Sequence, residues 1–171
     1  MDSKLTTSLT SSQTIGPFPH EGWKWGIDAT AQVPTAALTI TGAVFDGAAK
    51  PVDDAVIEAW TPAAERGNRL LYLGVLRRVP SDAQGGFTLA LPAPAPGDPA
   101  CYLTLFARGL VKHQFCAVFL EDDANLARSA LLAQVPEARR ATLLARRTGT
   151  GTYRWDIHLQ GAHETVFFDF C

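Results

Sequence analysis

The segment that most constrains the fold spans residues 37–60, ALTITGAVFDGAAKPVDDAVIEAW. Two apolar runs, rich in β-branched and aromatic residues, flank a break that contains Asp46-Gly47 and Pro51. Glycines and a proline at these spacings would interrupt a helix. Alternating apolar residues on both sides of a Gly/Pro turn predict two strands that fold back on one another. We therefore expect this segment to begin an antiparallel sandwich onto which the rest of the chain packs.

The remainder of the chain shows the same apolar runs separated by turn signals. Strands are predicted at residues 70–79, 87–91, 100–108, 115–120, 152–159 and 164–170. The four prolines of residues 92–99 predict an exposed loop. A helix is expected to begin at Pro136-Glu137, to run through 138–147 and to end before Gly149, and residues 126–135 should add a short turn of helix. The predicted fold class is mostly β, an antiparallel β-sandwich with one or two short helices.

Composition limits the organisation and location of the chain. Its 171 residues, 47% of them apolar, predict one domain over residues 15–171 behind a polar arm at residues 1–14. A net charge of −2 without a basic stripe argues against a nucleic-acid binder. The three cysteines (Cys101, Cys116 and Cys171) are odd in number and widely spaced, which is typical of free thiols. Because no signal-peptide core or membrane span is evident either, we expect a cytoplasmic protein.

Residues 16–25, GPFPHEGWKW, combine chain-breaking residues with large aromatic rings. Two prolines and two glycines predict a loop without regular structure. Phe18, Trp23 and Trp25 are costly to leave in water, so the loop must lie against another surface. That surface is either the rest of its own domain or a partner subunit, since aromatic residues are enriched at interfaces.

One group of residues has the composition of a metal site. Asp156 and His158 lie two apart on a predicted strand, hence on one face, and His163 follows closely. A 2-His-1-carboxylate iron site is conceivable from these residues. Arg154 shares the same face, which instead favours the solvent-exposed side of an amphipathic strand.

Arg108 is the main candidate for binding a carboxylate. It follows the predicted strand Leu105-Phe106-Ala107 and precedes Gly109. A guanidinium at such a position can present a bidentate fork to a carboxylate. The alternative is an ordinary surface ion pair with one of the 17 acidic residues, and the same two interpretations apply to Arg77 and Arg78.

A set of motifs occurs in order along the chain. They are Ser12-Gln13-Thr14-x-Gly16-Pro17-Phe18, Gly42-x-Val44-x-Asp46-Gly47, Val56-x-Glu58-x-Trp60, Leu105-Phe106-Ala107-Arg108-Gly109, Tyr153-Arg154-x-Asp156-Ile157 and Glu164-Thr165-Val166-Phe167-Phe168-Asp169-Phe170. From Ser12 to the C-terminus the chain resembles the intradiol ring-cleavage dioxygenase family, and within it the α subunits of protocatechuate 3,4-dioxygenases. The resemblance implies a β-sandwich, in agreement with the strand pattern.

The resemblance also implies where a metal should and should not be. Iron-binding members of the family hold Fe(III) through two tyrosines and two histidines, the histidines as His-x-His. At that position this chain reads Ala100-Cys101-Tyr102, without either histidine. Only Tyr72 falls near one tyrosine position, and residues 92–99, near the other, contain none. The implied cofactor, Fe(III), is therefore expected on an iron-binding β subunit, with no metal site and no catalytic residue in this chain.

By the same resemblance, Gly16, Pro17, Phe18 and Arg108 are expected to bind substrate at the interface with that β partner. The implied reaction is cleavage of protocatechuate, an aromatic catechol-acid, with O2 to 3-carboxy-cis,cis-muconate. Family α subunits commonly carry Gly-Pro-Tyr, so Phe18 keeps the aromatic ring but lacks the hydroxyl. An alternative function is a non-catalytic, homo-oligomeric binding or structural module of the same fold, because it too would lack the iron ligands.

Overall fold

The computed structural model describes residues 19–31, 36–61 and 75–169. The helices are α1 (Pro19–Gly22), α2 (Lys24–Ala29), α3 (Ala130–Ala133) and α4 (Glu137–Arg140), with 3-10 turns η1 (Leu126–Arg128) and η2 (Ala141–Leu143). The strands are β1 (Leu38–Phe45), β2 (Val56–Trp60), β3 (Leu76–Pro80), β4 (Gly86–Leu91), β5 (Cys101–Phe106), β6 (Gln114–Leu120), β7 (Leu144–Gly149), β8 (Thr152–Arg154) and β9 (Ile157–His158). The predicted arm at residues 1–14 and the start of the predicted strand 70–79 lie outside the described ranges. No helix within those ranges has the length and apolar character needed to cross a lipid bilayer.

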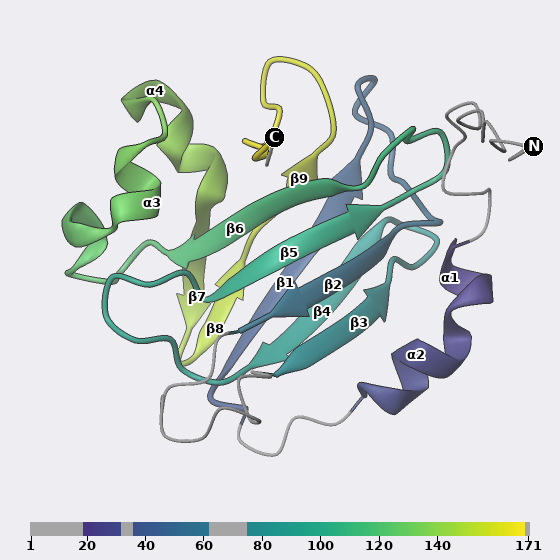
Figure 1. Ribbon diagram of the computed structural model, residues 1–171, viewed down its shortest axis with the longest axis horizontal. Helices are drawn as coiled ribbons and strands as arrows, with labels where there is room; N and C mark the ends of the chain where they lie inside the picture. Colours follow the sequence, from purple (N-terminus) through teal and green to yellow (C-terminus); the bar gives the residue numbers. More distant parts are fainter. Residues whose placement is uncertain (1–18, 32–35, 62–74, 170–171) are drawn as a thin grey trace, which may run out of the picture.

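The strands form one mixed sheet that is nearly closed, like a barrel, with a few short helices outside it (Figure 1). Its order is β3-β2-β5-β6-β7-β8-β1-β4, and β9 pairs with β1. The predicted mostly-β class is confirmed, but a purely antiparallel sheet is wrong, because β7 pairs parallel with β6, and β8 and β9 pair parallel with β1. The chain crosses from β6 to β7 through α3 and α4, and a crossover of this kind allows two consecutive strands to run parallel.

The predicted hairpin within residues 37–60 is also wrong. Both strands form, but β1 pairs with β4, whereas β2 pairs with β3 and β5. Ile40 and Ile57, one from each strand, are both fully buried in the same core. Local pairing within residues 37–60 is confined to the turn, where Phe45 bridges Pro51 and the backbone N–H of Val52 donates to the carbonyl oxygen of Val44 at 2.9 Å.

Four further elements differ from the prediction. The predicted helix at 136–147 ends at Arg140, and β7 begins at Leu144 because Leu144 and Ala145 pair with the end of β6. Residues 16–25, expected to lack regular structure, contain α1 and the start of α2. The predicted strand 164–170 is a loop in its described part, with one bridge between Phe168 and Phe115. Residues 152–159 form two short strands, β8 and β9, rather than one.

The core also holds two thiols. Cys101 and Cys116 are free and buried on the adjacent strands β5 and β6. Burial raises the pKa of both thiols, and the neighbouring Cys116 raises the pKa of Cys101 further. A thiol in the unfolded chain has a pKa near about 8.5.

These thiols predict a loss of stability in mild alkali. Because the pKa of each thiol is raised in the folded state, the protonated thiols contribute their full share of the unfolding free energy below about pH 8.5. Above that pH the thiols of the unfolded chain release their protons and those of the folded chain do not, so this share is lost. Between pH 7.5 and 9.5 each thiol should cost about 1.4 kcal/mol of unfolding free energy. Urea unfolding in reductant at both pH values measures this loss. Cys116→Ala should lower the unfolding free energy at both pH values, yet reduce the loss of unfolding free energy between pH 7.5 and pH 9.5. An unchanged loss would contradict the role given to the Cys116 thiol.

Candidate functional site

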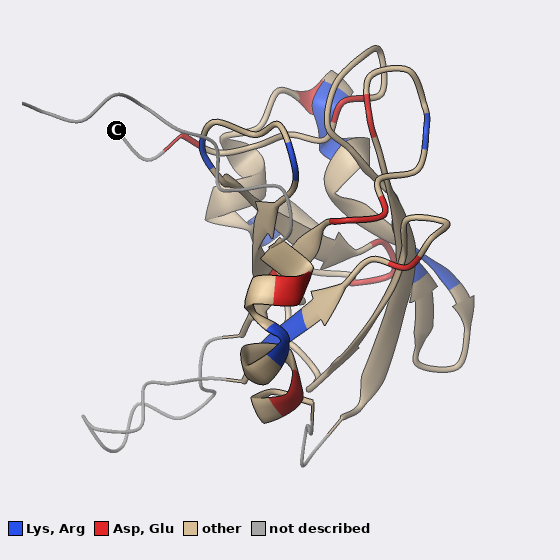
Figure 2. Cartoon of the chain, turned by 90° about the vertical axis from the view of Figure 1, so that its right-hand side faces the viewer, with Lys and Arg blue, Asp and Glu red and all other residues tan. Residues whose placement is uncertain are grey.

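The side chains that point away from the core on β2, β3 and β5 form a mixed aromatic and charged surface, here called the outer face. Its residues are Leu76 and Arg78 on β3, Glu58 and Trp60 on β2, and Tyr102, Thr104 and Phe106 on β5. The helices α1 and α2 flank β3 (Figure 1). On the side of the molecule that carries these two helices, acidic and basic residues are interspersed (Figure 2). The two helices thus border the outer face on its β3 side (Figure 1), and Trp60 on β2 is 40% exposed.

Two arginines fasten α2 to β3. Arg78 pairs with Glu58 across the outer face, and its backbone N–H donates to the hydroxyl of Thr30 at 2.9 Å. Arg77 donates from its guanidinium to the carbonyl oxygen of Thr30. Gly26 packs closely against the Arg78 side chain, so that a Cβ there would lie 3.0 Å from Nη1. Arg78 therefore forms an ion pair within the fold, and Arg77 a hydrogen bond to the backbone, so both arginines make structural contacts rather than the carboxylate-binding site offered as the other interpretation.

The aromatic residues of 16–25 divide between two surroundings. Trp23 meets Phe106 edge to face, with ring centroids 4.5 Å apart, so this part of the segment packs on its own domain. Trp25 is 71% exposed, which leaves a large apolar ring available to a partner. Gly16, Pro17 and Phe18 lie outside the described residues. The chain that directly follows them nonetheless reaches Phe106, two residues before Arg108.

Arg108 lies just beyond β5, next to two acidic residues of the β1–β2 connection. Its Nε is 3.0 Å from Oδ2 of Asp54, and its backbone N–H lies 3.5 Å from Oδ1 of the same carboxylate. The Asp54 side chain is 5% exposed, whereas that of Arg108 is 62% exposed. Asp53, itself exposed, is 3.9 Å from one terminal nitrogen. Asp54 thus forms a close ion pair with Nε of Arg108, while the arginine side chain stays largely exposed with Asp53 beside one terminal nitrogen.

Asp54 is the functional candidate that sequence reasoning missed. It lies in the polar run Val52-Asp53-Asp54 between two strands, where an acidic pair normally marks an exposed turn. Its burial depends on the path of β5, which is distant in sequence. Asp54 becomes a functional candidate only through its contact with Arg108, which the sequence does not show.

The residues at the expected His-x-His position do not fit a ferric ion. Ala100 is buried and has no donor atom, and Tyr102 lies on the outer face with its ring 5.5 Å from that of Trp60. Burial, aided by the negative charge of Asp98, raises the pKa of Tyr102. Within residues 19–31, 36–61 and 75–169 no three His, Cys, Asp or Glu side chains are grouped to hold a metal.

The alternative metal candidate is occupied by other contacts. Asp156 Oδ1 accepts from the backbone N–H of Ala43 at 2.9 Å and lies 2.6 Å from Nη2 of Arg154. The His158 ring stacks on Phe45, with centroids 5.2 Å apart. Arg154 lies beside Asp156, as the alternative interpretation expected, but Asp156 falls in the break between β8 and β9 rather than on one continuous strand.

Comparison with known proteins shows the family to which the chain belongs. No protein-family model matches it. The protocatechuate 3,4-dioxygenase alpha chain of Burkholderia cepacia is 33% identical over 194 aligned positions, covering 96% of this chain and 98% of the relative. The corresponding alpha chain of Pseudomonas putida is 30% identical and covers 94% of this chain and 96% of that protein. The chain belongs to the family of protocatechuate 3,4-dioxygenase alpha chains. The resemblance seen in the motifs is thereby confirmed.

Solved structures agree on the fold of this intradiol dioxygenase family member. The dioxygenase domain of a carbohydrate-binding fusion protein from Streptomyces sp. SirexAA-E superposes with a TM-score of 0.56 at 23% identity, covering 78% of this chain and 85% of that one. Hydroxyquinol 1,2-dioxygenase from Pseudomonas putida DLL-E4 gives a TM-score of 0.52 at 17% identity, covering 75% of this chain and 58% of that enzyme. At these identities the likeness concerns the fold alone.

Proposed function

We propose that the chain is the non-iron-binding α subunit of a protocatechuate 3,4-dioxygenase. In this proposal it completes the substrate pocket of an iron-binding β subunit that cleaves protocatechuate with O2 to 3-carboxy-cis,cis-muconate. Membership in the alpha-chain family supports the partnership, and the residues at the His-x-His position support placing the iron on the partner. The free thiols Cys101 and Cys116 support a reducing, cytoplasmic location.

The observation that carries the proposal is the anchoring of Arg108. Asp54 pairs with Nε, and the Arg108 side chain is 62% exposed, so its guanidinium remains available to receive a substrate carboxylate. Gly16, Pro17 and Phe18 are proposed to line the same pocket, since the chain that follows them packs at the Arg108 end of β5. The exposed Trp25 supplies apolar contact area for the partner.

In this proposal the two subunits would have different roles in the reaction. The ferric ion of the β subunit, when bound, would ligate the catecholate and prepare the ring for O2. Arg108 would bind the carboxylate of the substrate and so set the ring's orientation, while the Phe18 ring would pack beside it and exclude water. No proton transfer is assigned to this chain, because the Arg108 guanidinium is placed as a hydrogen-bond donor to the substrate carboxylate and Phe18 has no hydroxyl.

Co-expression with an iron-binding β chain from the same source tests the proposal. We expect a stable complex, one iron site per β chain, and O2 uptake with protocatechuate only when both chains are present. Iron content and oxygen-electrode rates of each chain alone and of the complex are the measurements. A β chain that is fully active alone, or a failure of the two to associate, would leave the homo-oligomeric binding module as the better account.

A further inference from the structure

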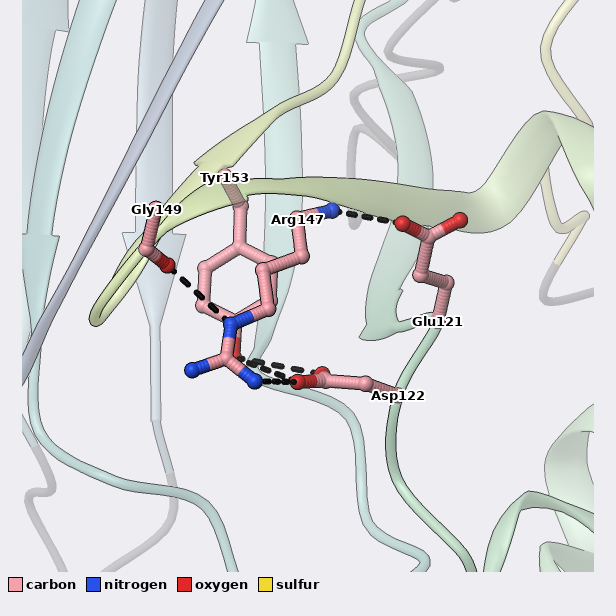
Figure 3. Close-up of polar contacts among 5 residues, drawn as sticks. All are labelled: Glu121, Asp122, Arg147, Gly149 and Tyr153. Atoms are coloured by element: carbon pink, nitrogen blue, oxygen red, sulfur yellow. Dashed lines mark hydrogen bonds and ion pairs between the residues drawn. The ribbon is translucent and has the colours of Figure 1, made fainter.

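Two consecutive arginines of β7 have opposite surroundings. Arg147 is held on one side of the strand, where its Nη1 is 3.2 Å from Oδ2 of Asp122 and its Nε donates to the carbonyl oxygen of Gly149 at 3.1 Å (Figure 3). Tyr153 donates its hydroxyl to the same Asp122 carboxylate at 3.2 Å. The charge of Arg147 is therefore matched within the fold, and this side of β7 needs no further ligand.

Arg146 points to the other side of the same strand, because side chains alternate along β7. There it lies directly opposite Arg154 on β8. Arg154 already has a partner in Asp156, at 2.6 Å, whereas Arg146 makes no ion pair with any residue that the structure describes. Like charges directly opposite in a sheet destabilise it. One uncompensated positive charge thus remains on this side.

A hollow of about 390 Å³ opens at this point. Arg146, Arg154, Asp156, His158 and His163 contribute to its lining. The ring of His158 is held by stacking on Phe45, and the ring of His163 lies 6.1 Å from it, centroid to centroid. A neutral imidazole carries one N–H donor, so the imidazoles can add donors to those of the guanidinium groups.

The hollow therefore offers donors and positive charge, and its one carboxylate is already engaged. Asp156 Oδ1 receives both Arg154 and the backbone N–H of Ala43. The complement of such a lining is an anionic ligand that carries several acceptor oxygens. A cation is disfavoured, because Arg146 and Arg154 face the same space.

We propose that this hollow binds a small oxyanion of the phosphate or polycarboxylate class, with Arg146 as its main charge partner and Arg154, His158 and His163 around it. Binding would neutralise the opposed arginines and join β7, β8 and the segment at His163. The hollow shares no lining residue with the pair of Arg108 and Asp54. The proposal is thus independent of the proposed function.

Calorimetric titration of the full chain, or of its complex with the β subunit, with inorganic phosphate and with citrate tests this site. At fixed ionic strength and with chloride as the competing anion, we expect saturable one-site binding of at least one of the two probes, and the tighter one identifies the anion class. Arg146→Gln should weaken that binding about tenfold, and His163→Ala about threefold. Melting curves without anion check that the variants fold.

Arg128→Gln is the matched control. Arg128 lies in η1, is exposed, and is absent from the lining of the hollow, so the substitution makes the same change in net charge. It should leave the dissociation constant unchanged. The proposal is overturned if neither probe binds saturably, or if Arg128→Gln and Arg146→Gln weaken binding equally, since that would be a general charge effect.

Discussion

Replacing Arg108 by glutamine in the two-subunit complex is expected to lower kcat/KM for protocatechuate about ten- to a hundredfold. Glutamine keeps a polar side chain but removes the charge and the fork of donors that a carboxylate accepts. Because the carboxylate is present in the free substrate as well as in the transition state, most of the loss should appear as a raised KM. Steady-state oxygen uptake over a range of protocatechuate concentrations measures it.

The substrate itself supplies the sharpest control. Catechol lacks the carboxylate, so its turnover by Arg108→Gln should stay within about twofold of that of the unaltered complex. Equal losses with both compounds would show that the substitution damages the assembly rather than recognition of the carboxylate, and would contradict the assignment of Arg108.

The two neighbouring aspartates test how Arg108 is positioned. Asp54→Asn removes the buried charge 3.0 Å from Nε and should raise KM for protocatechuate in the same direction as Arg108→Gln, by about five- to tenfold. Asp53→Asn makes the same chemical change 3.9 Å away at an exposed site and should alter KM by less than about twofold. A role confined to stability would instead change the melting temperature without this KM difference.

The largest effect on folding is expected from Gly42→Ala. A Cβ at residue 42 would lie 1.8 Å from the carbonyl oxygen of Trp155 and 2.5 Å from Cζ of Phe87. Neither can withdraw easily, because the backbone N–H of Trp155 donates to the carbonyl of Thr41 at 2.9 Å and Phe87 is buried in the core. We expect a loss of about 3 kcal/mol or more, equivalent to a fall of about 6 to 12 °C in melting temperature.

Gly22→Ala is the matched comparison for this measurement. A Cβ at Gly22, in the exposed helix α1, would meet nothing within 4 Å. Both substitutions change the unfolded chain alike, so their difference reports the folded state. Gly22→Ala should leave the melting temperature within about 2 °C or raise it slightly. Similar melting temperatures for the two variants would mean that β1 and Trp155 approach less closely than described.

Several parts of the fold were predictable because their signals are local. The proline-rich segment 92–99 is a loop, the turn before β4 forms at Asp82, and β5 and β6 lie where alternating apolar runs placed them. The ordered motifs along the chain identified the family correctly, because they consist of residue types at fixed spacing rather than of contacts. The absence of histidine at positions 100 and 102 can likewise be read from the sequence without a structure.

Pairing partners were not predictable in the same way. Residues 144 and 145 lie in a run of good helix formers, yet β6 draws them into the sheet, because a buried backbone must pair with the strand beside it. Asp54 reads as a turn residue until β5 covers it and brings Arg108 within 3.0 Å. The contrast between Arg146 and Arg147 also depends on which neighbour each side of β7 faces.

The sequence by itself determined the mostly-β class, the family and the absence of histidines at the position where iron-binding members carry them. Each of these follows from residue type, periodicity or spacing along the chain. Only the tertiary structure decided the mixed, nearly closed sheet, the anchoring of Arg108 by Asp54 and the pairing of Arg146 with Arg154 across two strands. The physical reason is that burial and charge compensation depend on residues far apart in the chain, and their contacts exist only once the sheet has closed around its core.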